Sequence, residues 1–135
     1  MRVAGLVEEL QTTHDKRCAV YQSYDDAISK FKSSKDNEKF QKDKKKIDSD
    51  HKKLTQSVSL IQNKLRADSL ESAEKVKELQ ILDSQLKESI SQSIQLAEKI
   101  VTGKLQKPQY MEQENKHVAK RTDVMQKMEA LVTSL

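Results

Sequence analysis

The chain has 135 residues, of which 34% are charged and 35% hydrophobic, and its net charge is +4. Two glycines and one proline are too few for the turns of a many-stranded sheet protein or for a glycine-rich phosphate loop. A single cysteine excludes a disulfide framework and a cysteine-based zinc finger. Because the hydrophobic fraction lies below the roughly 45–50% of ordinary globular domains, we expect an elongated helical protein or a core shared with a partner.

Apolar residues at alternating steps of three and four predict a first helix over residues 2–32. The positions are Val3, Val7, Leu10, Tyr21, Tyr24, Ile28 and Phe31, with His14 and Arg17 in the same register. Such spacing is typical of the seam between two packed helices. The polar run over residues 32–37 interrupts the pattern, and a Ser or Asp there can cap the next helix.

The same spacing predicts a second helix over residues 37–66. Its seam positions are Phe40, Lys44, Ile47, His51, Leu54, Val58, Ile61 and Leu65. The spacing of Asp68 and Glu71 fits a capping box, in which each side chain bonds to the backbone near the other. We therefore expect a turn at residues 67–69.

A third helix, expected over residues 69–102, has the most apolar seam and should be the best buried. Its positions include Leu70, Ala73, Val76, Leu79, Leu82, Leu86, Ile90 and Ala97. Gly103 and Pro108 flank the next break, since glycine favours a left-handed C-terminal cap and proline disrupts a helix interior. A fourth helix follows over 109–134, with Met111, Glu114, Val118, Arg121, Met125, Met128, Val132 and Leu135 in register.

Short connections between long helices make neighbouring helices antiparallel. The sequence thus predicts one all-α domain over residues 1–135, in which four long helices form an elongated up-down antiparallel bundle or coiled-coil hairpins. The expected helix-packing core is Tyr21, Ile28, Phe31, Phe40, Ile47, Leu54, Val58, Ile61, Leu65, Leu79, Leu82, Leu86, Ile90, Met125 and Met128.

Basic charge is concentrated between Lys30 and Lys53. This stretch contains ten lysines and five acidic residues, and the rest of the chain is nearly neutral. The candidate polyanion-binding residues are Lys42, Lys44, Lys45, Lys46, Lys52 and Lys53. Such a cluster can bind nucleic acid, an acidic protein surface or anionic lipid. We favour a solvated helix face, because acids at helical spacing dilute the field and aromatic residues for base stacking are scarce.

His14 and Cys18 are four residues apart, so their side chains can meet on one helix face. An antiparallel pairing of the first two helices would bring His51 close to Cys18, giving three ligands of a metal site or a thiol–imidazole pair. A polar layer within the helix seam is the interpretation that we favour. We expect no catalytic residues, no metal site and no cofactor, and therefore no enzyme.

One family resemblance covers roughly residues 17–132. It rests on Arg17, Tyr21, Phe31, Phe40, Ser57, Ile61, Leu65, Val76, Leu79, Gln80, Leu82, Leu86, Gln95, Leu96, Met125, Met128, Glu129, Ala130 and Leu131. In this order the residues resemble the required-for-excision 1-B family of DNA-repair proteins. The resemblance implies a small, non-catalytic protein associated with excision repair, linked to DNA directly or through a repair partner.

These observations predict a non-enzymatic adaptor or scaffold that binds other proteins or itself through helix seams. DNA excision repair is the process that the resemblance implies. A cytoskeletal, ciliary or trafficking-complex subunit and a direct nucleic-acid binder acting through residues 30–53 are the alternatives. The apolar stretch from Val3 to Val7 is too short for a signal peptide or a membrane span. A lone cysteine fits an intracellular protein of the cytoplasm or nucleus.

Overall fold

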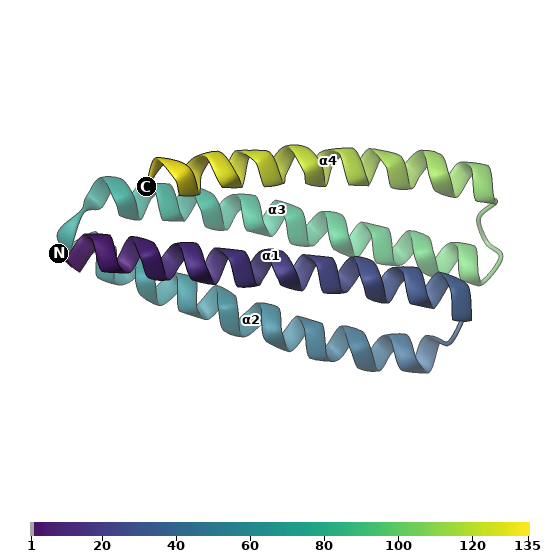
Figure 1. The fold of residues 1–135 in the computed structure, drawn as a ribbon. Coiled ribbons are helices and arrows are strands. Elements are labelled where there is room, and N and C mark those ends of the chain that lie inside the picture. Colours follow the sequence, from purple (N-terminus) through teal and green to yellow (C-terminus); the bar gives the residue numbers. More distant parts are fainter. Residues whose placement is uncertain (1) are drawn as a thin grey trace.

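The computed structural model describes residues 2–135 and is an all-α bundle of four helices in up-down-up-down order (Figure 1). Helix α1 spans Arg2–Ser34, α2 spans Asn37–Asp68, α3 spans Leu70–Val101 and α4 spans Lys107–Ser134. At 1.5 Å per residue each helix is about 40–50 Å long. The predicted all-α class and the four-helix bundle are confirmed. Within residues 2–135 no helix has the length and apolar character that a membrane crossing requires.

Capping residues mark the starts of α2 and α3. Asp36 caps α2 by accepting a hydrogen bond from the Lys39 amide at 3.1 Å. The capping box expected for Asp68 is wrong by one residue, because α2 continues through Asp68 and Ser69 caps α3 by accepting from the Ser72 amide. Gly103 ends α3 with a φ of 75°, a left-handed conformation that glycine adopts without strain.

The fourth helix starts at Lys107, two residues before the predicted start. Pro108 lies in its first turn, where the helix requires no backbone N–H donor from that residue. The sequence prediction placed the proline outside the helix, but its fixed φ also suits a helix start.

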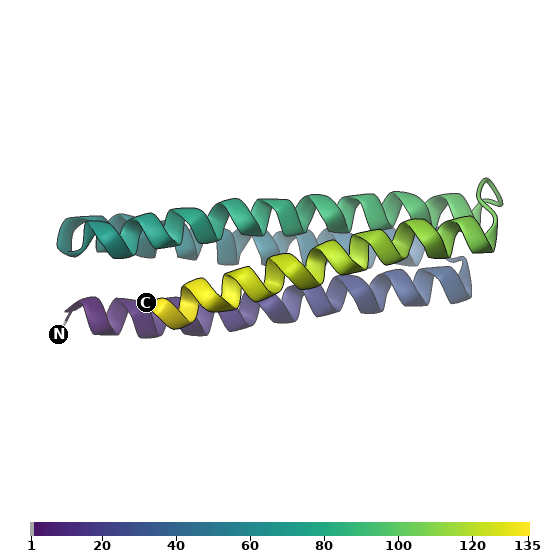
Figure 2. The ribbon, with the colours of Figure 1, turned by 90° about the horizontal axis from the view of Figure 1, so that it is seen from above.

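The four helices pack as two antiparallel hairpins, α1 with α2 and α3 with α4. Helix α3 joins the hairpins, because it also contacts α2 and, to a lesser extent, α1. Figure 2 shows that α4 starts beside the end of α3 and leans obliquely across the bundle towards the N-terminal half of α1. The backbones of α1 and α4 therefore approach each other much less than those of the other neighbours.

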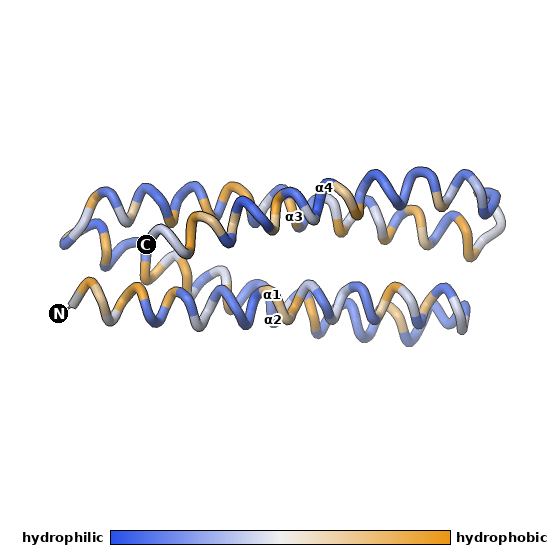
Figure 3. Tube along the Cα trace, turned by 45° about the horizontal axis from the view of Figure 1, so that its top comes forward, coloured by the Kyte–Doolittle hydropathy of each residue, from blue (hydrophilic) through white to orange (hydrophobic). Residues whose placement is uncertain are grey.

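The expected core residues lie in one cluster along the bundle axis, and apolar positions recur along every helix in Figure 3. Twelve of the fifteen are buried: Tyr21, Ile28, Phe31, Phe40, Ile47, Val58, Ile61, Leu65, Leu79, Leu86, Ile90 and Met128. The other three, Leu54, Leu82 and Met125, are partly buried and pack against this cluster.

Candidate functional site

A groove of about 690 Å³ runs between α1 and α4, on the side where these helices diverge. Helix α3 supplies its apolar floor through Leu86 and Ile90. Helix α4 adds Val118 and Met125, and α1 adds Ile28. Val118 is 45% exposed although it is a large apolar residue. The predicted seam of α4 therefore lines an open groove from Glu114 to Met125, whereas Met128 and Val132 are buried in the core.

Polar side chains of α1 and α4 contact each other across this groove at three positions along its length. His14 Nε2 of α1 lies 2.9 Å from Glu129 Oε1 of α4 at one end. Near the middle, Asp25 Oδ1 lies 3.7 Å from Arg121 Nη2. At the other end, Lys32 Nζ donates to the Tyr110 hydroxyl at 2.7 Å. Long polar side chains make these contacts, because the backbones of α1 and α4 lie further apart than those of the other neighbouring helices.

Arg121 organises the middle of the groove. Its Nη1 donates to Ser93 Oγ at 2.6 Å, and its Nη2 pairs with Glu114 Oε1 at 3.2 Å. Ser93 in turn donates to Glu114 Oε1 at 2.9 Å. Burial raises the pKa of Asp25, while the positive charge of Arg121 opposes the rise. Ser93 is fully buried, so its hydroxyl serves these hydrogen bonds and faces no substrate space.

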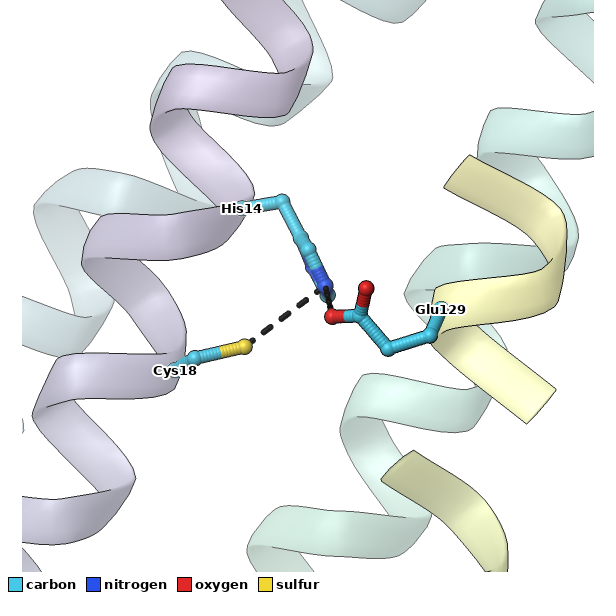
Figure 4. Close-up of side chains that lie close together, drawn as sticks. All are labelled: His14, Cys18 and Glu129. Atoms are coloured by element: carbon cyan, nitrogen blue, oxygen red, sulfur yellow. Dashed lines mark hydrogen bonds and ion pairs between the residues drawn. The ribbon is translucent and has the colours of Figure 1, made fainter. Parts of the chain in front are cut away.

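His14, Cys18 and Glu129 meet at the end of the groove opposite the Lys32–Tyr110 contact (Figure 4). Cys18 Sγ lies 3.5 Å from His14 Nε2, and Glu129 reaches across from α4 to the same nitrogen. Burial is the main cause that raises the pKa of Cys18 to about 11, and the negative charges of Glu129 and Asp15 add to it. The side chain is therefore a neutral thiol at neutral pH and a poor nucleophile.

The structure does not bring His51 to this cluster, so the alternative grouping of His14, Cys18 and His51 that the sequence allowed does not form. His51 Nε2 instead lies 3.0 Å from Asp83 Oδ2 and 3.1 Å from the Tyr21 hydroxyl. Tyr21 donates to Asp83 Oδ1 at 2.8 Å. The position of Asp83 on α3 explains the difference, because its carboxylate accepts from both His51 and Tyr21.

Arg17 completes this second cluster inside the bundle. Its Nε lies 3.2 Å from Asp83 Oδ1, and its Nη1 donates to Gln80 Oε1 at 2.6 Å. Arg17 is 1% exposed and Asp83 is 3% exposed. Burial alone would raise the pKa of Asp83, but the His51 hydrogen bond, the Arg17 charge and the Tyr21 hydrogen bond outweigh it and hold that pKa below its ordinary value.

The candidate polyanion-binding lysines divide into two groups. Lys42, Lys45, Lys46, Lys52 and Lys53 are exposed on α2, and none of them pairs with a carboxylate within residues 2–135. Lys44 is half-buried and pairs with Asp48 Oδ2 at 2.9 Å. Asp48 also accepts from Tyr24 and from Lys87. Lys44 thus belongs to a structural contact.

The sequence predictions missed Asp83 and Glu129 as members of polar clusters. A signal existed for Asp83, which lies seven residues after Val76 and seven before Ile90, on the buried face of α3. Glu129 lies eleven residues after Val118, so both residues share one face of α4. Nothing in that spacing indicates that this face opposes His14. No known protein-family model matches the chain.

Proposed function

We propose that the protein is a non-enzymatic helical adaptor that binds an amphipathic helix of another protein in the groove between α1 and α4. The observation that supports this is the groove itself, in which Val118 is exposed and Met125 partly exposed above a buried floor of Leu86 and Ile90. A helix laid in such a groove buries apolar residues at steps of three, four and seven. Each Leu-sized side chain that becomes buried contributes about 1.5–3 kcal/mol.

The charges at the groove specify the partner further. Three carboxylates line it, those of Asp25, Glu114 and Glu129, against two cations, Lys32 and Arg121. Asp25 is half-exposed and its ionised form is disfavoured by burial. An apolar helix face flanked by Lys or Arg would supply a counter-charge to this carboxylate. We therefore propose a basic amphipathic helix as the occupant.

A photo-reactive phenylalanine at position 118 tests this proposal, with the same residue at position 60 as the matched control. Val118 and Leu60 are both exposed apolar residues, but only Val118 lines the groove. We expect crosslinks from position 118 that map by mass spectrometry to one basic amphipathic segment of a partner. The crosslinks should disappear when Met125→Asp is added.

Two outcomes would contradict the proposal. One is an equal yield of the same products from position 60, which would show that the capture is unspecific. The other is a crosslink between two copies of this chain, which would make the groove a homodimer interface.

For the process, we propose DNA excision repair in the cytoplasm or nucleus. The support for it is the resemblance over residues 17–132 and the lone cysteine. Identification of the crosslinked partner tests the process directly. A cytoskeletal, ciliary or trafficking partner would replace the repair assignment and leave the adaptor function in place.

The lysine face of α2 supports a second candidate function, the direct binding of nucleic acid. At 100° per residue, Lys42, Lys45, Lys46, Lys52 and Lys53 fall within an arc of about 120°. Asp43, Asp48 and Asp50 point about 100–120° away from the centre of that arc. These three acids therefore flank the lysine arc, and Asp48 and Asp50 each lie about 40° from the nearest of these lysines.

Binding of labelled single- and double-stranded DNA to a charge-reversed variant tests this candidate. We expect Lys45, Lys46 and Lys53 changed to Glu to abolish binding, and wild-type affinity to fall steeply with salt. A control with Lys77, Lys116 and Lys120 changed to Glu alters the net charge equally on other exposed surfaces. Equal losses in both variants, or no wild-type binding at low salt, would reject the candidate.

A further inference from the structure

We propose that His14, Cys18 and Glu129 form a binding site for Zn²⁺ at one end of the groove, with water as the fourth ligand. The three donor atoms all lie within 4.8 Å of one another. His14 and Cys18 come from consecutive turns of α1, and Glu129 comes from α4 (Figure 4). The inference is independent of the partner helix proposed above.

The donor set matches the chemistry of this ion. Zn²⁺ takes imidazole nitrogen, thiolate sulfur and carboxylate oxygen in tetrahedral geometry. Three protein ligands and one open position are the arrangement of zinc sites that keep a water or an exchangeable ligand. A mixed nitrogen, sulfur and oxygen set also disfavours Mg²⁺ and Ca²⁺, which prefer oxygen ligands alone.

The distances between the three donor atoms require movements of up to about an ångström to reach tetrahedral geometry. With metal–ligand bonds of about 2.0–2.3 Å, the donors of a tetrahedral site lie roughly 3.4 Å apart. The observed distances from His14 Nε2 are 3.5 Å to Cys18 Sγ and 2.9 Å to Glu129 Oε1. Glu129 Oε1 has to move away from His14 by about half an ångström. The third pair, Cys18 Sγ and a Glu129 carboxylate oxygen, lies within 4.8 Å and has to close by up to about 1 Å. The Glu129 side chain is 60% exposed, so its movement meets little resistance.

The charges also balance. A Cys18 thiolate and a Glu129 carboxylate carry together the charge that neutralises a divalent cation, while the imidazole stays neutral. Binding forms one metal–sulfur bond and releases the thiol proton to water. The ion reaches the site through the groove, because Cys18 and Glu129 both line it. His14 lies behind them and is 1% exposed.

The surroundings of His14 Nδ1 set the expected affinity for Zn²⁺. Coordination through Nε2 moves the imidazole proton to Nδ1, and this buried atom has no hydrogen-bond partner within residues 2–135. Zinc-bound imidazoles normally donate from this second nitrogen, and loss of such a partner weakens binding by about 10–100-fold. We therefore expect weaker binding than in zinc sites with a complete outer shell of hydrogen bonds.

Glu129 changes the interpretation of His14 and Cys18. The sequence favoured a polar packing layer for this pair, since two ligands and a distant His51 made an incomplete set. In the structure α4 supplies a third ligand of the correct chemistry. A packing layer accounts for buried His14 but does not require an exposed glutamate to reach across the groove.

Titration of the purified protein with Co²⁺, a spectroscopic substitute for Zn²⁺, tests the site. The chain contains one cysteine, so thiolate-to-cobalt charge-transfer absorption reports Cys18 alone. We expect one Co²⁺ per chain, visible tetrahedral d–d bands, and loss of the charge-transfer band when Zn²⁺ is added. Cys18→Ser should abolish that band, and Glu129→Gln should weaken Co²⁺ binding at least tenfold.

His117→Ala and Glu112→Gln are the controls, since they alter residues of the same types on α4 outside the cluster. Both should bind Co²⁺ as the wild type does. Helical circular dichroism of Glu129→Gln should match the wild type, because that residue is exposed. Absence of a charge-transfer band in the wild type would overturn the proposal. Unchanged affinity in Glu129→Gln, or a stoichiometry of one ion per two chains, would also overturn it.

Discussion

Polar residues on the two faces of α1 differ in their exposure to solvent. Towards α2 and α3, Arg17 and Tyr21 converge on Asp83 in a closed cluster that excludes solvent. Towards α4, Asp25 and Arg121 meet at 3.7 Å across an open groove. The same helix thus contributes to a sealed seam and to a surface that remains available.

Burial and hydrogen bonding account for the difference. Asp83 accepts from His51 and Tyr21 and faces Arg17, so its negative charge is stabilised inside the bundle. Asp25 has one ion-pair partner and is 49% exposed. The pKa of Asp83 is lowered, whereas the pKa of Asp25 is raised. The Asp83 cluster is part of the core, whereas the Asp25–Arg121 contact lies where a ligand can still change the charge interactions of Asp25.

The largest expected effect on the free energy of unfolding comes from a carboxylate introduced into the core, compared with one introduced at the groove. Val58→Asp puts a charge at a fully buried position of α2, and we expect a loss of about 3–5 kcal/mol in the free energy of unfolding. Val118→Asp, at the groove, should change it by less than about 0.5 kcal/mol. Urea unfolding followed by circular dichroism measures both. Similar losses would show that the groove is as closed as the core.

The next largest effect concerns the Arg17–Asp83 ion pair. Arg17→Met should cost about 3 kcal/mol, because it leaves the Asp83 charge buried without its guanidinium partner. Arg17→Met combined with Asp83→Leu should lose less than the sum of the two single changes, since no unpaired charge remains. A double-mutant cycle in urea checks this. Additive losses would mean that the two residues do not stabilise each other.

Apolar spacing was sufficient to predict the four helices and most of the core, because each seam lies on one face of one helix. The groove could not be predicted in this way. It arises from the oblique path of α4, which starts beside the end of α3 and crosses towards the N-terminal half of α1, a tertiary arrangement that no single helix pattern contains. The pairing of His14 with Glu129 depends on that same arrangement, which is why the sequence suggested His51 instead.

Carboxylates whose pKa values are lowered by their partners should also govern stability in acid, and Asp83 of the closed cluster is one of two within residues 2–135. The pKa values of Asp83 and Asp48 are lowered in the folded state, so their stabilisation is complete above the unfolded pKa of about 3.9. It is lost as the pH falls through the lower folded values. We expect urea midpoints of the wild type to fall in this range and those of Asp83→Asn to fall less. The exposed control Asp123→Asn should keep the wild-type slope.

The smallest expected effect is that of Asp25→Asn in the groove. The folded pKa of Asp25 is raised, chiefly by burial, so its ionised form is less favourable in the folded than in the unfolded protein. That cost is present above the folded pKa and is relieved as the pH falls through it towards the unfolded value. At neutral pH, Asp25→Asn should therefore leave the urea midpoint unchanged or slightly higher, while Asp83→Asn lowers it. A loss as large as that of Asp83→Asn would mean that the Asp25–Arg121 contact closes the bundle, and a partner helix could then enter the groove only by breaking a stabilising ion pair.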